Sequence, residues 1–387
     1  GKRLCSPLPH RVLVVVGTRP EAIKMAPVVK SMRAYEPNIE TRLVLTGQHS
    51  TLVEQVLDVF SLVPDYDLKI MTEAQSLSDI VRGSMDGLRH VISTFSPDMV
   101  LVQGDTASVF AGSISAFFEQ IKVGHVEAGL RSHDKSAPFP EEVMRRLTDV
   151  VADLHFAPTR NAVAALHREG IQGDGIHLTG NTVVDALLSV AAADEPVQSS
   201  KLRTLIADKN TRLVLLTAHR RESFGQPLQN IFSAVRELED REGSVHILYP
   251  IHPNPNISKP ANQALSSHPR IHLIEPLSYT DLVAVLRAAD LVLTDSGGIQ
   301  EEAPTFGTHV LILRDVTERP EGIEVGAAEL VGTNQGRIVD RSLAALSLSR
   351  TSKGVNPYGD GRAGKRIADI VNSELTGHSR ETKDWIP

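Results

Sequence analysis

The feature that most constrains the fold is a repeated alternation of short apolar runs with longer segments of helical periodicity. The runs are apolar on both faces, which is typical of strands in a parallel sheet covered by helices. The first half contains six runs, at 11–16, 41–46, 98–103, 122–127, 153–158 and 176–180. The second half contains five, at 212–217, 245–250, 271–275, 290–295 and 309–314. The sequence therefore predicts an α/β fold with two doubly wound, Rossmann-like sheets.

The two halves predict two domains. The chain has 387 residues, and a typical domain has roughly 100–200. A small, polar segment with one proline, residues 191–201, lies near the expected boundary. We expect an N-terminal domain at 11–180 and a C-terminal domain at 181–365. Two facing sheets leave a cleft lined by the carboxyl ends of their strands, which is where we expect the ligand.

Composition argues against several classes of protein. The formal net charge is −7, so duplex nucleic acid is not an expected partner. Cys5 is the single cysteine, which rules out an internal disulfide and suits a reducing compartment. No apolar run approaches the roughly 18 residues of a membrane span, and residues 1–11 lack the apolar centre of a signal peptide. We expect a soluble cytoplasmic protein with no membrane partner.

The stretch VLVVVGTRPEAIKMAPVV joins the first apolar run to a helical pattern. Thr18 and Glu21 have the spacing of a capping box, so helix initiation alone is one interpretation. The other is anion binding, because the helix N-terminus and the Arg19 guanidinium would meet a diphosphate together. Lys24 lies about one turn further on, and Pro27 should kink or end this helix early.

Three carboxylates are candidates for proton transfer. Asp105 and Glu127 each follow a buried strand, where they cap a helix or line the cleft. Glu141 opens a helix, and Arg145 follows four residues later. For this last pair, an acidic helix start with an ordinary ion pair is the alternative interpretation.

The second half carries groups suited to a phosphate. Two glycines after the strand at 290–295 would let a phosphate approach the start of a helix. Glu302, about one and a half turns later, could accept hydrogen bonds from ribose hydroxyls. For His219 and Arg220, a solvated basic loop is the alternative interpretation. The candidate phosphate ligands are His219, Arg220, Ser296, Gly297, Gly298 and Arg319.

No spacing typical of a metal site, a Walker A loop or a nucleophile elbow occurs in the sequence. The 15 histidines are scattered. The sequence therefore predicts no bound metal.

Ten stretches together resemble one family, the non-hydrolysing UDP-N-acetylglucosamine 2-epimerases. They run in family order from about Val12 to about Ala363: GTRPEAIKMAP, QGDT, GHVEAGLR, FPEE, HRRESFG, HPNPN, TDSGGIQEEAP, RDVTERPE, VGT and NPYGDGRA. The resemblance implies the two-domain, GT-B-like architecture of nucleotide-sugar glycosyltransferases, with residues after about 366 packing back on the N-terminal domain. It also implies a homodimer.

The resemblance further implies interconversion of UDP-GlcNAc and UDP-ManNAc without NAD, a metal or another cofactor. Such enzymes expel UDP while a base removes the C2 proton, and UDP then adds back to the 2-acetamidoglucal. The acid/base candidates are then Asp105, Glu127 and Glu141, with Lys24, Arg145 and His219 as electrostatic partners. The diphosphate ligands are then Arg19, His219, Ser296, Gly297 and Gly298, with Glu302 on the ribose.

The chain departs from the family pattern in two stretches. Met144 stands where the family usually has asparagine, and GTHV at 307–310 replaces the frequent GKPV. Three rival functions stay open: a hydrolysing epimerase releasing free ManNAc, an epimerase of a modified UDP-sugar, and a non-catalytic UDP-sugar sensor. Retention of all three carboxylates argues against the sensor.

Several members of the resembled family bind a second, regulatory UDP-GlcNAc beside the active site. Gln48, His49 and His252 are the candidate residues for such a site. Ser50 and Ala74 stand where regulated members often carry arginine. We therefore expect little activation by UDP-GlcNAc.

Overall fold

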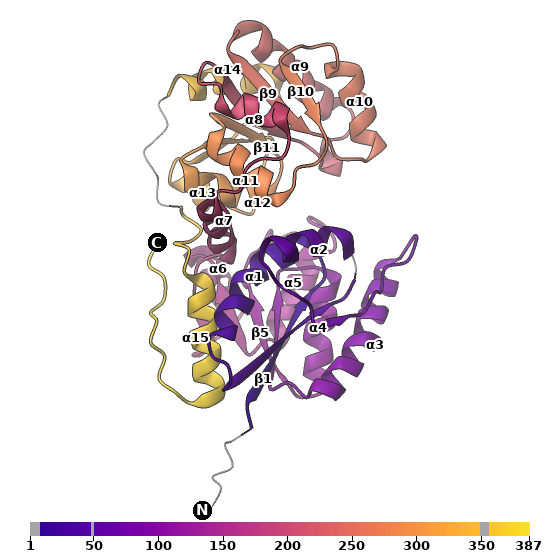
Figure 1. The fold of residues 1–387 in the computed structure, drawn as a ribbon, viewed down its shortest axis with the longest axis vertical. Coiled ribbons are helices and arrows are strands. Elements are labelled where there is room, and N and C mark those ends of the chain that lie inside the picture. The colour runs from indigo at the N-terminus through magenta and orange to yellow at the C-terminus, as the bar shows by residue number, and fades with distance from the viewer. Residues whose placement is uncertain (1–7, 48–49, 349–355) are drawn as a thin grey trace, which may run out of the picture. The chain divides into compact units, whose positions relative to one another are not determined.

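The chain divides into two compact units in the computed structural model, which describes residues 8–47, 50–348 and 356–387 (Figure 1). The N-terminal unit runs to Ala186 and resumes at Tyr358–Pro387, and the C-terminal unit is Leu187–Pro357. Each unit contains one all-parallel sheet with helices along it, which is the Rossmann-like arrangement that the sequence predicts.

The sheet of the N-terminal unit has seven strands in the order β3-β2-β1-β4-β5-β6-β7. Its strands are β1 His10–Val16, β2 Ile39–Leu45, β3 Tyr66–Asp67, β4 Met99–Gln103, β5 Lys122–Val126, β6 Leu154–Ala157 and β7 Ile176–Leu178. Its helices are α1 Arg19–Arg33, α2 Ser50–Val59, α3 Leu77–Phe95, α4 Ala107–Phe118, α5 Glu141–Val151, α6 Arg160–Arg168 and α15 Ala363–Thr376, and α7 Thr182–Ala193 runs past the boundary. The chain reverses direction across the sheet between β1 and β4, which makes the end of these two strands the switch point where such folds bind ligands.

The sheet of the C-terminal unit has six strands in the order β10-β9-β8-β11-β12-β13. Its strands are β8 Arg212–Thr217, β9 Val245–Pro250, β10 Ile271–Ile274, β11 Leu291–Thr294, β12 His309–Ile312 and β13 Ala328–Leu330. Its helices are α8 Ser200–Ala207, α9 Gln226–Arg241, α10 Pro255–Leu265, α11 Tyr279–Ala288, α12 Gly297–Glu302, α13 Glu321–Glu324 and α14 Gln335–Ser347, with short 3-10 turns η1 Arg221–Ser223 and η2 Ala303–Phe306. The switch point of this sheet lies between β8 and β11.

Every strand that the sequence predicts is present, within three residues at each end. Two strands were not predicted, β3 and β13, which are two and three residues long. Segments this short cannot show the two-residue hydrophobic period of a strand, so the sequence pattern does not predict them.

We expected Pro27 to kink α1 or to end it early, and the early end is wrong. The helix continues to Arg33 with Pro27 inside it. Proline removes one backbone hydrogen bond from a helix, and burial of both flanking turns of α1 offsets that loss, since Met25, Ala26, Val28 and Val29 are all buried. In Figure 1 α15 runs alongside α1, and its Gly364 comes so close that a Cβ there would lie 2.8 Å from the Pro27 carbonyl oxygen.

The capping box expected at Thr18 and Glu21 is also absent. Thr18 is the N-cap residue, but its side chain accepts no hydrogen bond from the helix. Instead its hydroxyl donates to Glu21 at 2.6 Å, and the Gly17 N–H donates to the same carboxylate at 3.2 Å. The glutamate side chain is therefore turned toward the loop rather than used to close the helix end.

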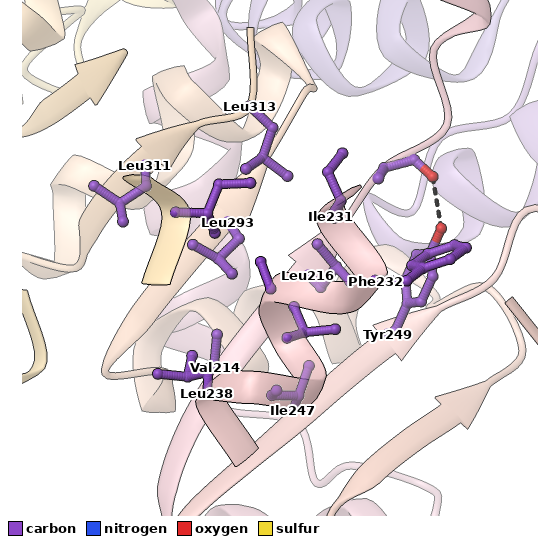
Figure 2. Close-up of a cluster of buried hydrophobic side chains, with 14 of the residues drawn as sticks. Val214, Leu216, Ile231, Phe232, Leu238, Ile247, Tyr249, Leu293, Leu311 and Leu313 are labelled. Atoms are coloured by element: carbon purple, nitrogen blue, oxygen red, sulfur yellow. Dashed lines mark hydrogen bonds between the residues drawn. The ribbon is translucent and has the colours of Figure 1, made fainter. Parts of the chain in front are cut away.

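The C-terminal unit is organised around a core that packs α9 against its sheet. Figure 2 shows Ile231, Phe232 and Leu238 of α9 packed over strand residues such as Val214 and Leu293. Tyr249 closes this core at the carboxyl end of the strands, where its hydroxyl donates to the Ala218 carbonyl oxygen at 2.8 Å (Figure 2). This hydrogen bond anchors the turn that follows β8 to the core.

Among the helices in the described residues, we find none that combines the length and the apolar composition needed to span a membrane.

Candidate active site

The switch point of the N-terminal unit is held together by Glu21. Its carboxylate accepts hydrogen bonds from the turn after β1 and, at 3.1 Å, from the hydroxyl of Thr106 in the turn after β4. Burial raises the pKa of Glu21 to about 7, a rise that the neighbouring Asp105 charge reinforces. One buried carboxyl group therefore joins the two turns that face each other at the switch point.

Glu127 follows β5 and is paired with Lys24 of α1. The Lys24 ammonium and the Asn181 amide, the latter at 2.9 Å, both donate to Oε2 of Glu127. Lys24 and Glu127 are both buried. This is a carboxylate with fixed donors in a nearly dry environment, which suits a group that exchanges a proton with a ligand.

Asp105 follows β4 and is paired with Arg145 of α5. Nη2 of Arg145 donates to Oδ2 of Asp105 at 2.8 Å. Arg145 is held in turn by Glu142, at 3.4 Å, and the Glu142 carboxylate is itself held by the backbone N–H of Ser132 at 2.7 Å. Asp105 is the most exposed of these charged groups, with 27% of its side chain accessible. A ligand could therefore reach Asp105 while its cation stays fixed.

Glu141 is the first residue of α5 and is half-buried. Arg19 is the first residue of α1 and is also half-buried. Both lie in the N-terminal unit, at the start of helices whose later residues, Arg145 and Lys24, take part in the two pairs described above.

The switch point of the C-terminal unit is held together by Asp295. This buried carboxylate accepts the backbone N–H groups of His219 and Arg220 at 2.8 and 2.9 Å. Its other oxygen lies 3.4 Å from Nδ1 of His219. The ring of His219 also stacks on the exposed ring of His252, with 6.1 Å between their centroids. Asp295 therefore fixes the backbone of His219 and lies next to its ring.

Ser296 is the N-cap residue of α12, Gly297 and Gly298 are its first two residues, and Glu302 ends it. The Ser296 side chain caps no helical N–H group. A Cβ at Gly297 would collide with the guanidinium of Arg319, so only glycine lets Arg319 lie across the helix start. The Arg319 guanidinium and the N-terminus of α12 then lie together, and both favour binding of an anion.

Three arginines surround Glu318 beside this turn. Arg319 pairs with it directly, Arg314 lies 3.1 Å away and Arg220 lies 3.8 Å away. Burial alone would raise the pKa of Glu318, but Arg319 and Arg314 outweigh it and lower the pKa to about 2. Arg319 also pairs with Glu301, and Arg220 and Arg314 also pair with Glu222. The three guanidiniums are therefore balanced by three carboxylates, which hold the arginine side chains in place.

Within the described residues, one group of side chains has the spacing of a metal site: Glu239, Asp240 and His268. Its central carboxylate is already engaged, since Glu239 accepts from Nδ1 of His268 at 2.6 Å and from the Arg270 N–H at 2.9 Å. The group lies at the end of α9 and shares no residue with the two switch points.

Comparison with known proteins identifies the family. The model of the UDP-N-acetylglucosamine 2-epimerase family matches residues 31–372. The UDP-N-acetylglucosamine 2-epimerase of Bacillus subtilis (strain 168) is 45% identical over 380 residues, which are 97% of this chain and 98% of that protein. This chain belongs to the UDP-N-acetylglucosamine 2-epimerase family.

Solved structures of the epimerase family match the fold as well. The S. aureus MnaA–UDP structure has a TM-score of 0.89 and 43% identity, covering 97% of this chain and 100% of that one. The Neisseria meningitidis UDP-GlcNAc 2-epimerase bound to UDP-GlcNAc has a TM-score of 0.86 and 39% identity, covering 95% of this chain and 100% of that one. The predicted GT-B-like class, α/β with two Rossmann-like sheets, is confirmed.

Two departures from the epimerase family pattern have a local structural description. Met144 is half-buried on α5, one residue before the arginine that holds Asp105. Thr308 is buried and its hydroxyl donates to the Leu286 carbonyl oxygen at 2.9 Å, so the GTHV loop is anchored without a lysine. Gln48 and His49 lie outside the described residues.

Sequence reasoning missed four residues that this epimerase family member uses to build the switch points: Glu21, Glu142, Asn181 and Asp295. Glu21 looked like half of a local capping box, and its partner Thr106 is 85 positions away. Asp295 carried the one usable signal, since it stands directly before the Ser-Gly-Gly turn at the end of a buried strand.

Proposed function

We propose that this chain interconverts UDP-GlcNAc and UDP-ManNAc without net hydrolysis. The observation that carries the proposal is the presence of two candidate carboxylates in one unit, each tied to its own fixed cation: Glu127 to Lys24 and Asp105 to Arg145. Inversion at C2 needs proton transfer on both faces of that carbon, and two independently anchored carboxylates suit this requirement.

The chemistry follows from the poor acidity of the C2–H bond. A base takes the C2 proton, the electron pair of that bond forms the C1=C2 double bond, and the C1–O bond breaks with its electrons going to UDP. The 2-acetamidoglucal that remains is protonated at C2 on the other face, and UDP adds back at C1. In this scheme Asp105, Glu127 and Glu141 serve as acid/base groups, with Lys24, Arg145 and His219 as electrostatic partners.

The diphosphate acts both as a handle and as the leaving group. Departing negative charge is stabilised best by donors that are already oriented. In this proposal His219, held by Asp295, joins Arg220, Arg319 and the Ser296–Gly298 turn as ligands of UDP. Glu302 takes the ribose, and Arg19 adds a guanidinium from the N-terminal unit. A homodimer remains a prediction from the family resemblance.

The test is proton NMR of the enzyme with UDP-GlcNAc in D2O, without added NAD or metal. The proposal expects UDP-ManNAc to form and solvent deuterium to appear at C2 of both nucleotide sugars. Retention of the original C2 hydrogen during turnover would rule out the elimination mechanism. Accumulation of free ManNAc and UDP would favour the hydrolysing alternative, and UDP binding without turnover would indicate a sensor.

A further inference from the structure

Two turns of the N-terminal unit carry candidate carboxylates: Asp105 in the turn after β4 and Glu127 in the turn after β5. A fully buried pair, His125 of β5 and Asp149 of α5, contacts both turns. Nδ1 of His125 lies 2.6 Å from Oδ1 of Asp149, and Nε2 lies 2.7 Å from the Gly104 carbonyl oxygen. Both distances are those of strong hydrogen bonds. The imidazole therefore bridges a helix and the turn after β4.

The hydrogen bonds define the protonation state of this bridge. A carbonyl oxygen only accepts, so Nε2 of His125 must donate to Gly104. An ionised Asp149 also only accepts, so Nδ1 must donate as well and the ring is an imidazolium. Burial works to lower the pKa of His125, but the Asp149 charge outweighs it and the pKa is raised. Arg131 pairs with Asp149 as well, and on its other side with Glu169.

The bridge ends one residue before Asp105. Gly104 has a φ of +85°, a conformation that glycine adopts without strain, and its carbonyl oxygen is the acceptor for His125. Asp149 lies one turn after Arg145 on α5, and Arg145 holds the Asp105 side chain. Helix α5 therefore holds Asp105 in two ways: Asp149 acts through His125 on the neighbouring backbone, and Arg145 binds the Asp105 side chain.

Asp149 also reaches the turn that carries Glu127. Its Oδ2 accepts the backbone N–H of Gly129 at 3.3 Å, two residues after Glu127. Glu127 itself has a φ of +65°, which is strained for a side chain of this kind. Its N–H and that of Ala128 both donate to the Phe156 carbonyl oxygen, at 3.1 and 3.2 Å. The buried carboxylate therefore helps to hold a tight turn in place.

We propose that His125 and Asp149 form a positioning pair that sets the separation of Asp105 and Glu127 for proton transfer at C2. Neither residue needs to touch the sugar. The inference rests on the proposed epimerisation, because it assigns a role within that reaction. A displacement of about 1 Å in a reacting group can cost on the order of 100-fold in rate, so a rigid link under both turns has a direct consequence for turnover.

Two substitutions of one residue separate the two ends of the bridge. The amide nitrogen of glutamine reaches about as far as Nε2 of histidine, whereas that of asparagine reaches about as far as Nδ1. His125→Gln therefore retains a donor for the Gly104 carbonyl, and His125→Asn retains one only for Asp149. We expect kcat to fall about 100-fold in His125→Asn and by less than about 10-fold in His125→Gln. KM and the UDP dissociation constant should stay within about twofold of wild type in both.

The matched control is His155→Gln. His155 is a second buried histidine, directly opposite His125 on the neighbouring strand, and its Nε2 contacts the Asp149 backbone carbonyl at 2.9 Å. Within the described residues, its side chain makes no hydrogen bond to the turn of Asp105 or to the turn of Glu127, so turnover should stay within about twofold of wild type. Loss of turnover in the control equal to that in His125→Asn would overturn the proposal, as would equal kcat in the two His125 variants.

Hydrogen exchange measured by mass spectrometry provides a readout that does not depend on turnover. The Gly104 N–H donates to the Val126 carbonyl oxygen, and we expect its peptide to exchange at least 10-fold faster in His125→Asn than in His125→Gln. If wild-type enzyme does not epimerise UDP-GlcNAc, the proposed function fails while this comparison still tests the link. Equal exchange in the two variants would show that His125 does not fix the turn.

Discussion

Arg145 donates to Asp105 from a helix that begins four residues earlier with Glu141, so one helix carries both a candidate acid/base group and the cation of another. The arginine is 5% exposed and the Glu142 beside it is fully buried. Replacing Asp105 therefore leaves a cation that keeps a partner, whereas replacing Arg145 leaves two carboxylates close together.

The first prediction concerns the three carboxylates. Asp105→Asn, Glu127→Gln and Glu141→Gln should each lower kcat by about 100-fold or more, the usual scale for a lost acid/base group. UDP binding, measured by calorimetry, should change little. Glu119→Gln, at the exposed C-cap residue that follows α4, is the control and should behave as wild type. Near-normal turnover in all three variants would refute the assignment.

The second prediction concerns the stability of the buried pair. Lys24→Met leaves the Glu127 carboxylate buried without its cation, and this should lower the free energy of unfolding by about 3 kcal/mol. Lys24→Met combined with Glu127→Gln should recover most of that loss, because no buried charge is then left uncompensated. Urea unfolding followed by circular dichroism measures both. A double variant no more stable than the single one would contradict the pairing.

The third prediction concerns pH. The pKa of Glu21 is raised by burial to about 7, from 4.5 for an ordinary glutamate. The carboxyl therefore contributes stability in its protonated form below about pH 4.5, and this contribution is lost as pH rises through 7. The loss amounts to about 3 kcal/mol.

Glu21→Gln should remove the pH dependence that the Glu21 carboxyl group adds to the free energy of unfolding. The unfolding free energy of wild type relative to the variant should fall between pH 4.5 and pH 7, since glutamine cannot ionise. Chemical denaturation at a series of pH values measures the difference and cancels the titration of all other groups. A difference that is flat with pH would show that Glu21 titrates normally.

The sequence predicts the strands of the fold well and the side-chain contacts of the candidate site less well. The strands were predictable because buried parallel strands are continuous apolar runs. The order of the strands, and with it the position of each switch point, comes from the structure. Asp105 and Glu127 were predictable because they stand directly after such runs. The family resemblance implied that Arg145 and Lys24 are electrostatic partners of the carboxylates without saying which partner belongs to which. The structure pairs Arg145 with Asp105 and Lys24 with Glu127.

Other relationships had no local signal. Glu21 binds Thr106 across 85 positions, and Asp149 looks like one more charged residue in the periodic pattern of α5. The apparent capping box at Thr18 competed with the true arrangement, since the same spacing also allows the glutamate to turn toward the loop. Such contacts depend on how the strands are ordered, which spacing alone does not report.

The fourth prediction compares two neighbouring glycines. Gly297→Ala places a methyl group against the Arg319 guanidinium, whereas a Cβ at Gly298 meets its nearest atom, in Glu302, at 3.6 Å. Gly297→Ala should displace Arg319 and weaken UDP binding by at least 10-fold, because a charge-assisted hydrogen bond is worth about 1.5–3 kcal/mol. It should also lower the melting temperature.

Gly298→Ala is the matched control for stability. The substitution adds a methyl group in the same short helix without a close contact, so its melting temperature should equal or exceed that of wild type. Differential scanning fluorimetry with and without UDP measures both effects. Equal melting temperatures for the two variants would show that Arg319 yields freely and is not held over Gly297.

The last prediction concerns regulation. The family resemblance places a second nucleotide-sugar site around Gln48 and His49, which lie outside the described residues. Ser50 and Ala74 occupy positions where regulated relatives often have arginine, and two lost charge-assisted bonds cost about 1.5–3 kcal/mol each. A second site would then bind one to several orders of magnitude more weakly. We expect near-hyperbolic kinetics and immediate turnover of pure UDP-ManNAc. A long lag that a trace of UDP-GlcNAc abolishes would show instead that the regulatory site is intact.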